Sequence, residues 1–146
     1  SKVYPENINI YKDNAKKAIK EIKKTDLVIK TMLDSIKDKP YIVFHDAYQY
    51  FEKAYGLNAI GSILIDPELP PSPRRIINIR SKIKSLKAHC VFREPQFKAE
   101  IINTVIEDTN VKVGLLDPLG AALKPGPNMY NNLLKDISEN LKTCLK

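Results

Sequence analysis

The sequence has little of what most catalytic motifs require. Its 146 residues include five glycines, two histidines, two cysteines and no tryptophan. The glycines are too few and too scattered to form a phosphate-binding loop. None of the patterns G-x-G-x-x-G, G-x-x-x-x-G-K-[ST], G-x-S-x-G and H-E-x-x-H occurs. The sequence therefore carries no signature of a nucleotide-binding enzyme, a serine hydrolase or a zinc protease.

Long apolar runs are also missing. No segment approaches the ~18 consecutive apolar residues that a transmembrane helix needs. The first residues, SKVYPENINIY, lead directly into a predicted helix without an apolar targeting segment. We therefore expect either a cytosolic protein or a mature or excised piece of an exported one. With 43% hydrophobic residues, the chain is large enough for one domain with its own core.

Arginine is scarce, and the positive charge is spread thinly along the chain. The net charge of +7 comes from 20 lysines and four arginines set against 17 acidic residues. Residues 1–40 hold 10 basic and 6 acidic side chains, and the other 106 residues hold 14 and 11. Nucleic-acid-binding proteins cluster basic side chains and interleave aromatic ones. Since no such patch occurs, we expect a lysine-rich solvated surface and no nucleic-acid partner.

Residues 1–39 are predicted to form one long helix. Pro5 suits the first turn of a helix, and Pro40 ends the element. Only Thr25 interrupts the three- and four-residue spacing of a stripe of apolar and small residues. The stripe consists of Ile8, Tyr11, Ala15, Ala18, Ile22, Ile29, Met32 and Ile36. A coiled-coil dimer and a long helix packed along a sheet domain explain this stripe equally well.

Residues 40–146 alternate between predicted strands and predicted helices. The strands fall in YIVF (41–44), AIGSILI (59–65), HCVF (89–92) and VKVGLL (111–116). The helices fall in AYQYFEKAY (47–55), RRIINIRSKIKSLK (74–87), FKAEIINTVIED (97–108) and MYNNLLKDISENLKTCL (129–145). Such alternation implies βαβ crossovers and a parallel sheet. We predict an α/β fold, with a four-stranded parallel sheet flanked by helices, (βα)4, preceded by the long helix.

Side chains that could bind a metal or carry protons follow every predicted strand. They are His45 with Asp46, Asp66, Glu94 and Asp117. In an open parallel sheet, ligands bind outside the carboxyl ends of the strands. Asp66, Glu94 and Asp117 each precede a proline, which favours an extended backbone and keeps the acid at the strand tip.

Each of these residues also has an ordinary structural explanation. An acid before proline more often caps a turn, and a lone histidine at a strand end is more often a hydrogen-bonded edge residue. Imidazole and several carboxylates at one edge, however, are the ligands of zinc-type sites. Since catalytic motifs are missing, the pattern favours metal binding without catalysis. His89 begins its strand at the opposite edge and is not a candidate.

Cys90 and Cys144 lie 54 positions apart, unlike the short spacing of a C-x-x-C metal motif. Two buried thiols in a cytosolic domain would fit this spacing. A disulfide formed in an oxidising compartment would fit it equally well.

Three segments, FHDAYQYFEKAYGL, CVFREPQF and GLLDPLG, resemble the C-terminal lobe of the zinc-type solute-binding protein of ABC importers. The segment YPENINIYKDNAKKAIKEI is similar to the start of the backbone helix that joins the two lobes of this family. The likeness covers essentially the whole chain in the right order. It implies that residues 1–39 are the interlobe helix and residues 40–146 the C-terminal α/β metal-binding lobe. In the family, the metal lies in the cleft between the lobes.

The resemblance also implies ligands. The family's metal-binding histidine in FHDAY falls on His45, and its metal-binding aspartate in DPLG falls on Asp117. Relatives that favour manganese have a glutamate in place of this histidine, so the match implies zinc, which imidazole suits better. Asp46 is a candidate hydrogen-bond partner for the second ring nitrogen of His45. Glu94 is expected to face the cleft without being a ligand.

Two cysteines of zinc-type relatives fall on Cys90 and Cys144. The resemblance therefore implies a disulfide that ties the last helix to the third strand. The remaining ligands of the family are histidines of an N-terminal lobe, which this chain does not contain. His45 and Asp117 are fewer than the three or four protein ligands of a zinc site. We expect weak zinc binding with water completing the shell, and weaker binding still below about pH 6, where histidine protonates.

The function implied is that of a periplasmic, non-enzymatic receptor that captures zinc and delivers it to the membrane permease of an ABC importer. Two alternatives lie close to it: a manganese or iron receptor of the same family, and an adhesin-like module at the cell surface. A third is a small α/β hydrolase-like enzyme that uses His45 as a general base, with Asp46 or Asp117 orienting it.

Overall fold

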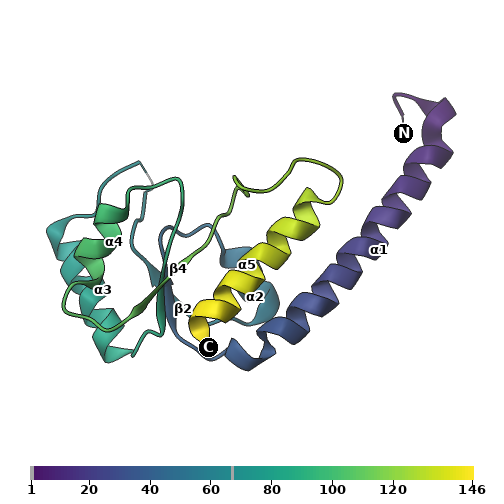
Figure 1. The fold of residues 1–146 in the computed structure, drawn as a ribbon. Helices are drawn as coiled ribbons and strands as arrows, with labels where there is room; N and C mark the ends of the chain where they lie inside the picture. Colours follow the sequence, from purple (N-terminus) through teal and green to yellow (C-terminus); the bar gives the residue numbers. More distant parts are fainter. Residues whose placement is uncertain (1, 67) are drawn as a thin grey trace.

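The computed structural model describes residues 2–66 and 68–146. Ser1, in the predicted helix, and Pro67, of the Asp66-Pro67 pair, lie outside the described residues. The fold has three layers, with a central sheet between two groups of helices, and one helix extends well beyond the rest (Figure 1). No helix in the described part of the chain combines the length and apolar character needed to cross a membrane.

The long helix is confirmed. A short 3-10 turn, η1 (Pro5–Asn7), leads into α1 (Ile8–Leu33), and a second turn, η2 (Asp34–Ile36), ends the element. The stripe expected from the sequence is only partly buried. Thr25, Ile29 and Leu33 are buried at intervals of four residues. Thr25 therefore belongs to the buried stripe that it was expected to interrupt, because residues four apart lie on one helix face.

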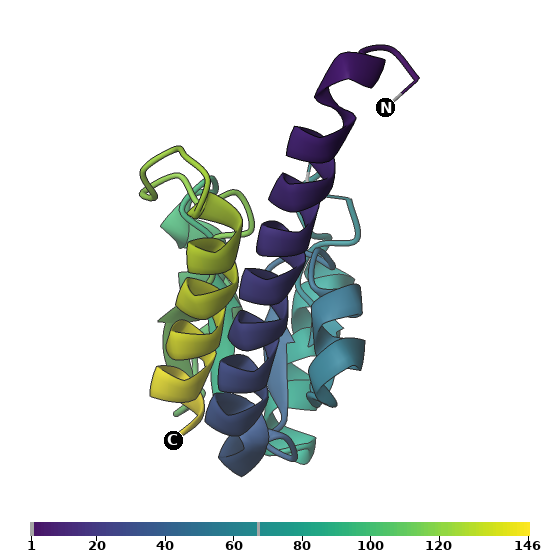
Figure 2. The ribbon, with the colours of Figure 1, turned by 90° about the vertical axis from the view of Figure 1, so that its right-hand side faces the viewer.

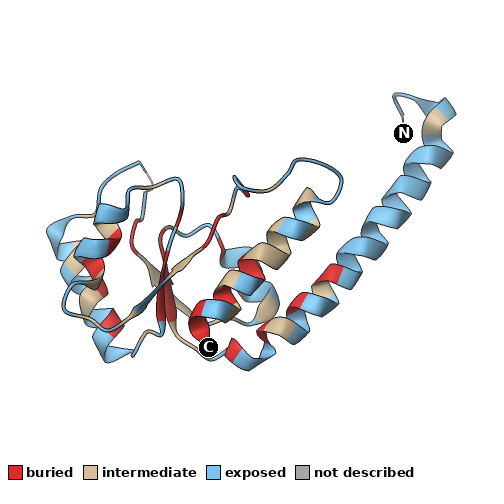
Figure 3. Ribbon diagram, in the orientation of Figure 1, coloured by how far each residue is buried: buried red, intermediate tan, exposed pale blue. Residues whose placement is uncertain are grey.

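The first half of α1 is exposed throughout. Every residue from 8 to 24 is exposed, including Ile8, Tyr11 and Ile22 of the predicted stripe. Figure 2 shows this half projecting past the end of the other helices, and Figure 3 shows it without a buried position. The first buried residue of α1 is Thr25. The second half packs along the sheet domain, so the packed-helix alternative describes that half of α1.

The four predicted strands form one parallel sheet. They are β1 (Tyr41–Val43), β2 (Ala59–Ser62), β3 (Cys90–Arg93) and β4 (Lys112–Leu115). All three pairings are parallel, and the strand order is β2-β1-β3-β4. Thus β3 lies between β1 and β4. The carboxyl ends of all four strands point toward one edge of the sheet, as predicted.

Helices cover both faces of the sheet. α2 (Gln49–Tyr55), α5 (Met129–Leu145) and the second half of α1 lie on one face, and α3 (Pro73–Ser85) and α4 (Ala99–Ile106) on the other (Figure 1). The side chains of β1 and of Phe44, the residue after it, alternately enter opposite cores: Tyr41 and Val43 join the first, Ile42 and Phe44 the second. This two-sided burial explains the unbroken apolar run YIVF.

The first core also contains the disulfide. Cys90 on β3 and Cys144 on α5 are bonded, with their Cα atoms 6.0 Å apart, within the usual range. The pairing implied by the resemblance is thus confirmed, and no free cysteine remains in the described chain. The bond fixes the last turn of α5 to the centre of the sheet.

Candidate metal centre

His45 lies two residues beyond the end of β1, at the carboxyl edge of the sheet. The strand before it is buried, whereas the His45 side chain keeps 23% of its surface exposed. The histidine therefore follows a buried strand and keeps part of its own side chain accessible. This is the position that the sequence predicts for a ligand.

The hydrogen-bond partner of His45 is Glu94. Nδ1 of His45 lies 2.8 Å from Oε1 of Glu94, although the two residues are 49 positions apart in the chain. The expected partner, Asp46, is exposed and accepts a hydrogen bond from Gln49 Nε2 at 2.6 Å. The prediction for Asp46 was wrong because β3 lies beside β1. That pairing brings Glu94, the residue after β3, next to His45. Asp46 instead accepts its hydrogen bond from Gln49, the first residue of α2.

Glu94 is almost completely buried, with 1% of its surface exposed. Burial raises the pKa of its carboxyl group, and the neighbouring His45 opposes part of that rise. Oε2 of Glu94 and the hydroxyl of Tyr48 are both buried without a close hydrogen bond, and the two groups interact with each other. Burial, followed by the Glu94 charge, raises the pKa of the Tyr48 phenol. Glu94 is therefore enclosed on the side away from His45.

Asp117 lies two residues beyond β4 and is 7% exposed. Its Oδ1 accepts hydrogen bonds from Gln96 Nε2 at 2.6 Å and from the Leu119 backbone N–H at 3.0 Å. Its Oδ2 accepts one from the Ala121 backbone N–H at 2.6 Å. The loop curls around the carboxylate because Gly120 takes a left-handed conformation, with φ of 65°.

These donors set the charge of Asp117. Burial alone would raise the pKa of the carboxyl group, but the hydrogen bonds from Gln96, Ala121, Leu119 and Gly120 outweigh it and lower the pKa below its usual value. Asp117 is thus held as a carboxylate, the form that binds a metal ion.

The other residues singled out from the sequence play local roles. Asp66 is exposed, and its Oδ1 accepts a hydrogen bond from the Glu68 backbone N–H at 2.9 Å, which is the turn-capping role. His89 precedes β3, and its backbone N–H donates to the Pro40 carbonyl at 2.8 Å. It lies at the amino end of the strand, as expected.

His45 and Asp117 each hydrogen-bond a residue of the same turn. Glu94 contacts His45 and Gln96 contacts Asp117, and these two residues are separated only by Pro95. Within residues 2–66 and 68–146, no group of three or more His, Cys, Asp or Glu side chains is arranged to hold a metal ion. The chain therefore offers two candidate ligands, fewer than a structural or catalytic zinc site uses.

Sequence reasoning did not single out Gln96 or Tyr48. Gln96 lies in the segment CVFREPQF, directly after the Glu94-Pro95 pair that ends a predicted strand. Its place at the carboxyl edge of the sheet could therefore have been predicted from the strand pattern. Tyr48 looked like one of several aromatic residues at the start of a helix. Nothing in the sequence distinguishes it.

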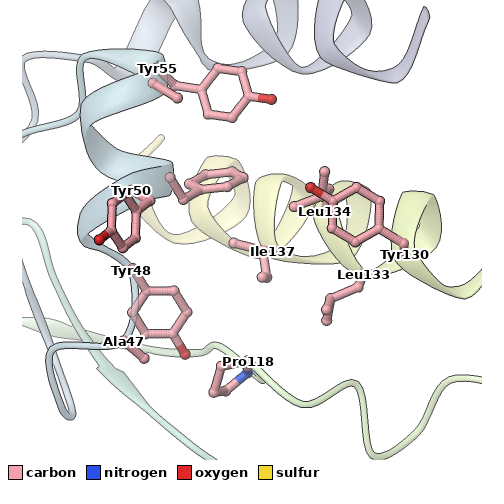
Figure 4. Close-up of a pocket in the computed structure, with 11 residues that line it drawn as sticks. Ala47, Tyr48, Tyr50, Tyr55, Pro118, Tyr130, Leu133, Leu134 and Ile137 are labelled. Carbon is pink, nitrogen blue, oxygen red and sulfur yellow. The ribbon is translucent and has the colours of Figure 1, made fainter. Parts of the chain in front are cut away.

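An apolar cavity adjoins the site. It has a volume of about 340 Å³ and lies between α2 and α5, with Tyr48 and Pro118 at one end. Figure 4 shows the Tyr48 hydroxyl directed toward Pro118, the residue after Asp117. No charged side chain of the described residues lines it. The cavity supplies apolar walls beside the candidate ligands and no ligand of its own.

Comparison with known proteins gives a consistent picture. The family described as "Zinc-uptake complex component A periplasmic" (ZnuA) matches residues 1–144. The high-affinity zinc uptake system protein ZnuA of Brucella abortus (strain 2308) is 47% identical over 141 residues. That match covers 97% of this chain and 42% of the Brucella protein, so the chain spans less than half the length of that relative.

Two solved structures agree in fold. A mutant of the laminin-binding adhesin Lmb of Streptococcus agalactiae is similar with a TM-score of 0.83 and 28% identity, over 97% of this chain and 53% of that one. A Zn(II)-bound mutant of AdcAII of Streptococcus pneumoniae is similar with a TM-score of 0.82 and 27% identity, over 100% and 53%. Since the family match runs over nearly the whole sequence, this chain belongs to the ZnuA family of zinc-uptake components.

Proposed function

We propose that this chain is the C-terminal part of a receptor that captures zinc outside the cytoplasmic membrane and delivers it to the permease of an ABC importer. His45 and Asp117 are the zinc ligands of this part. The observation that carries the proposal is the link of both side chains to one turn, Glu94 through Gln96, at the carboxyl edge of the sheet. The family match and the zinc uptake named for the Brucella relative support the same cargo.

The chemistry of the two residues supports zinc. Neutral imidazole is a borderline-soft ligand, and a carboxylate adds negative charge that offsets part of the metal charge. A manganese or iron receptor is the alternative within the family, and the imidazole disfavours it. The family is one of uptake components, which favours a receptor over an enzyme with His45 as a base.

Two ligands leave the centre incomplete, so further ligands come from a part of the receptor outside this chain. We propose that residues 1–39 act as the interlobe helix and that the exposed half of α1 packs against that missing lobe. The isolated chain then binds zinc weakly, with water completing the shell. It binds far less tightly than the whole receptor does.

The experiment is a calorimetric titration with zinc and with manganese at neutral pH. We expect weak zinc binding, weaker manganese binding, and loss of zinc binding in both His45→Ala and Asp117→Ala. His89→Ala is the matched control, because it removes the other histidine, at the opposite edge of the sheet. Zinc binding that survives both substitutions, or that disappears with His89→Ala alone, would contradict the ligand assignment.

A further inference from the structure

The turn after β3 contributes polar side chains to both candidate ligands. β3 lies between β1, which leads to His45, and β4, which leads to Asp117. The turn that follows β3, Glu94 to Phe97, therefore emerges between the two ligands. Its first residue bonds His45, and its third residue bonds Asp117.

Glu94 selects the tautomer of His45. When Glu94 is ionised it only accepts hydrogen bonds, and the 2.8 Å contact then places the proton of a neutral imidazole on Nδ1. Nε2 then carries the free lone pair, which is the atom that can bind a metal. If Glu94 were the donor instead, the proton would stand on Nε2 and that atom could not bind. The direction of this one hydrogen bond decides whether His45 is ready to bind.

Gln96 restricts Asp117 in a similar way. Each carboxylate oxygen offers about two lone-pair directions. Oδ1 already accepts from Gln96 Nε2 and from the Leu119 backbone N–H, which fills its lone-pair directions, whereas Oδ2 accepts from the Ala121 backbone N–H, and the Gly120 backbone N–H also hydrogen-bonds the carboxylate. The carboxylate is thereby prepared for metal binding through Oδ2.

The fourth residue of the turn packs against the histidine. The Phe97 ring lies with its centre 5.9 Å from that of His45, at an angle of 59°. Phe97 also stacks on Phe44, the residue before His45, with ring centres 4.6 Å apart. These contacts limit the rotation of the imidazole about its own side chain and keep the ring beside Glu94.

We propose that the turn Glu94–Phe97 is the positioning element of the metal centre: Glu94 keeps Nε2 of His45 free, and Gln96 occupies Oδ1 of Asp117 so that the metal ion is bound through Oδ2. This inference rests on the proposed function for the identity of the ligands. Glu94 and Gln96 act through His45 and Asp117 and are positioning residues. Partners of this kind typically change metal affinity by about 10- to 100-fold.

The tautomer is tested directly in the metal-free chain by long-range ¹H–¹⁵N correlation spectroscopy at pH 8. The sequence has only two histidines, so His89 provides a second imidazole in the same spectrum as a reference. We expect His45 to carry its proton on Nδ1. We expect Glu94→Met, of similar size but without an acceptor, to populate both tautomers. A proton on Nε2 in the unmodified chain, or an unchanged tautomer in Glu94→Met, would overturn the role of Glu94.

The conservative variant separates positioning from simple packing. Glu94→Gln retains a carbonyl acceptor for Nδ1, so it should keep the tautomer and lose less than about 10-fold in zinc affinity, against about 10- to 100-fold for Glu94→Met. If Glu94→Met does not fold, Glu94→Gln and the unmodified chain still decide the tautomer. Equal losses in both variants would contradict positioning through the hydrogen bond.

Gln96→Met tests the other half by NMR-monitored zinc titration. It removes the donor to Oδ1, and we expect a loss of about 10-fold in affinity with the tautomer of His45 unchanged. Full affinity in Gln96→Met would overturn its role. If His45→Ala and Asp117→Ala leave zinc binding intact, the proposed function fails, while the tautomer result stands independently. If those two abolish binding and neither Glu94→Met nor Gln96→Met affects it, this inference alone fails.

Discussion

The two candidate ligands lie at the same edge of the sheet, but they differ in burial. On one side the ligand is partly exposed and its hydrogen-bond partner is buried, and on the other side the ligand itself is buried. On the His45 side, the ligand is 23% exposed and its partner Glu94 is 1% exposed. On the Asp117 side, the ligand is buried, and its donors Gln96, Leu119 and Ala121 lie at the surface, whereas Gly120 is buried. Each pair thus joins an enclosed polar group to an accessible one, and only on the Asp117 side is the enclosed group the ligand itself.

This difference in burial predicts which ligand substitution should destabilise the protein more. A buried polar group that loses its partner costs free energy, because water cannot replace the lost hydrogen bond. An exposed donor that loses its acceptor turns to water. Removing the His45 side chain therefore takes from Glu94 its 2.8 Å hydrogen bond and leaves it only the weaker interactions with the His45 backbone N–H and the Tyr48 hydroxyl. Removing Asp117 leaves mainly surface N–H groups that solvent can satisfy.

The largest expected effect is the loss of stability in metal-free His45→Ala. We expect a decrease of about 2 kcal/mol in the free energy of unfolding for His45→Ala, against about 1 kcal/mol for Asp117→Ala. Urea denaturation followed by circular dichroism measures both. His89→Ala is the control, and its change should stay within about 0.5 kcal/mol. A greater loss in Asp117→Ala than in His45→Ala would contradict the comparison.

A double substitution sharpens the same test. If the cost of His45→Ala comes from the stranded Glu94 carboxylate, adding Glu94→Met should recover about 1 kcal/mol, because the buried charge is then gone. Failure to recover stability would show that the cost comes from lost packing against Phe97 instead.

A substitution in the backbone loop around Asp117 should also destabilise the site, with a smaller effect than His45→Ala. A Cβ atom at residue 120 would meet Leu123 at 3.0 Å and Leu133 at 3.3 Å, and the φ of 65° disfavours a side chain. We expect Gly120→Ala to cost about 1 kcal/mol and to weaken zinc binding, because the N–H groups around Asp117 shift. Calorimetric titration and urea denaturation measure the two effects.

Gly56 provides a matched control for this substitution. It ends α2 with almost the same φ, 66°, but a Cβ atom there meets nothing within 4 Å. Gly56→Ala should therefore cost a similar backbone strain and leave zinc binding unchanged. Equal effects of the two substitutions on zinc affinity would show that the Gly120 loop is not specifically required.

Much of the fold follows from local sequence signals. The bounds of α5 match the predicted segment 129–145, and the parallel sheet follows from the alternation of strands and helices. The burial of only half of α1 did not follow, since the apolar spacing continues through Ile8 and Ile22, which are exposed. Spacing shows which face is apolar, but a partner must be present to cover it.

The candidate site was predictable in its ligand positions but not in its hydrogen bonds. Acid-proline pairs mark strand ends, which is a local property. The choice of Glu94 over Asp46 as the partner of His45 depends on the order of strands in the sheet. That order is a property of the whole fold, so sequence reasoning selected the acid nearest in the chain.

The smallest expected effects are the opposite responses of the two carboxylates to pH. Burial raises the pKa of Glu94 above its unfolded value, with His45 opposing part of the rise. Its contribution to stability is therefore full below the usual glutamate pKa of about 4.3 and is lost as the pH rises through the raised value. Relative to Glu94→Gln, the unmodified chain should lose stability as the pH rises from about 4 to 7.

Asp117 should show the reverse slope. Burial favours its neutral form, but the hydrogen bonds from Gln96 and the loop prevail and lower its pKa. Its contribution is present above the usual aspartate pKa of about 3.9 and is lost as the pH falls through the lowered value. Relative to Asp117→Asn, the unmodified chain should therefore lose stability only below about pH 4. Urea denaturation of the three metal-free proteins from about pH 3 to pH 7 measures both slopes. Slopes of the same sign would mean that the two carboxylates are enclosed alike, and the contrast between the two sides of the site would then be wrong.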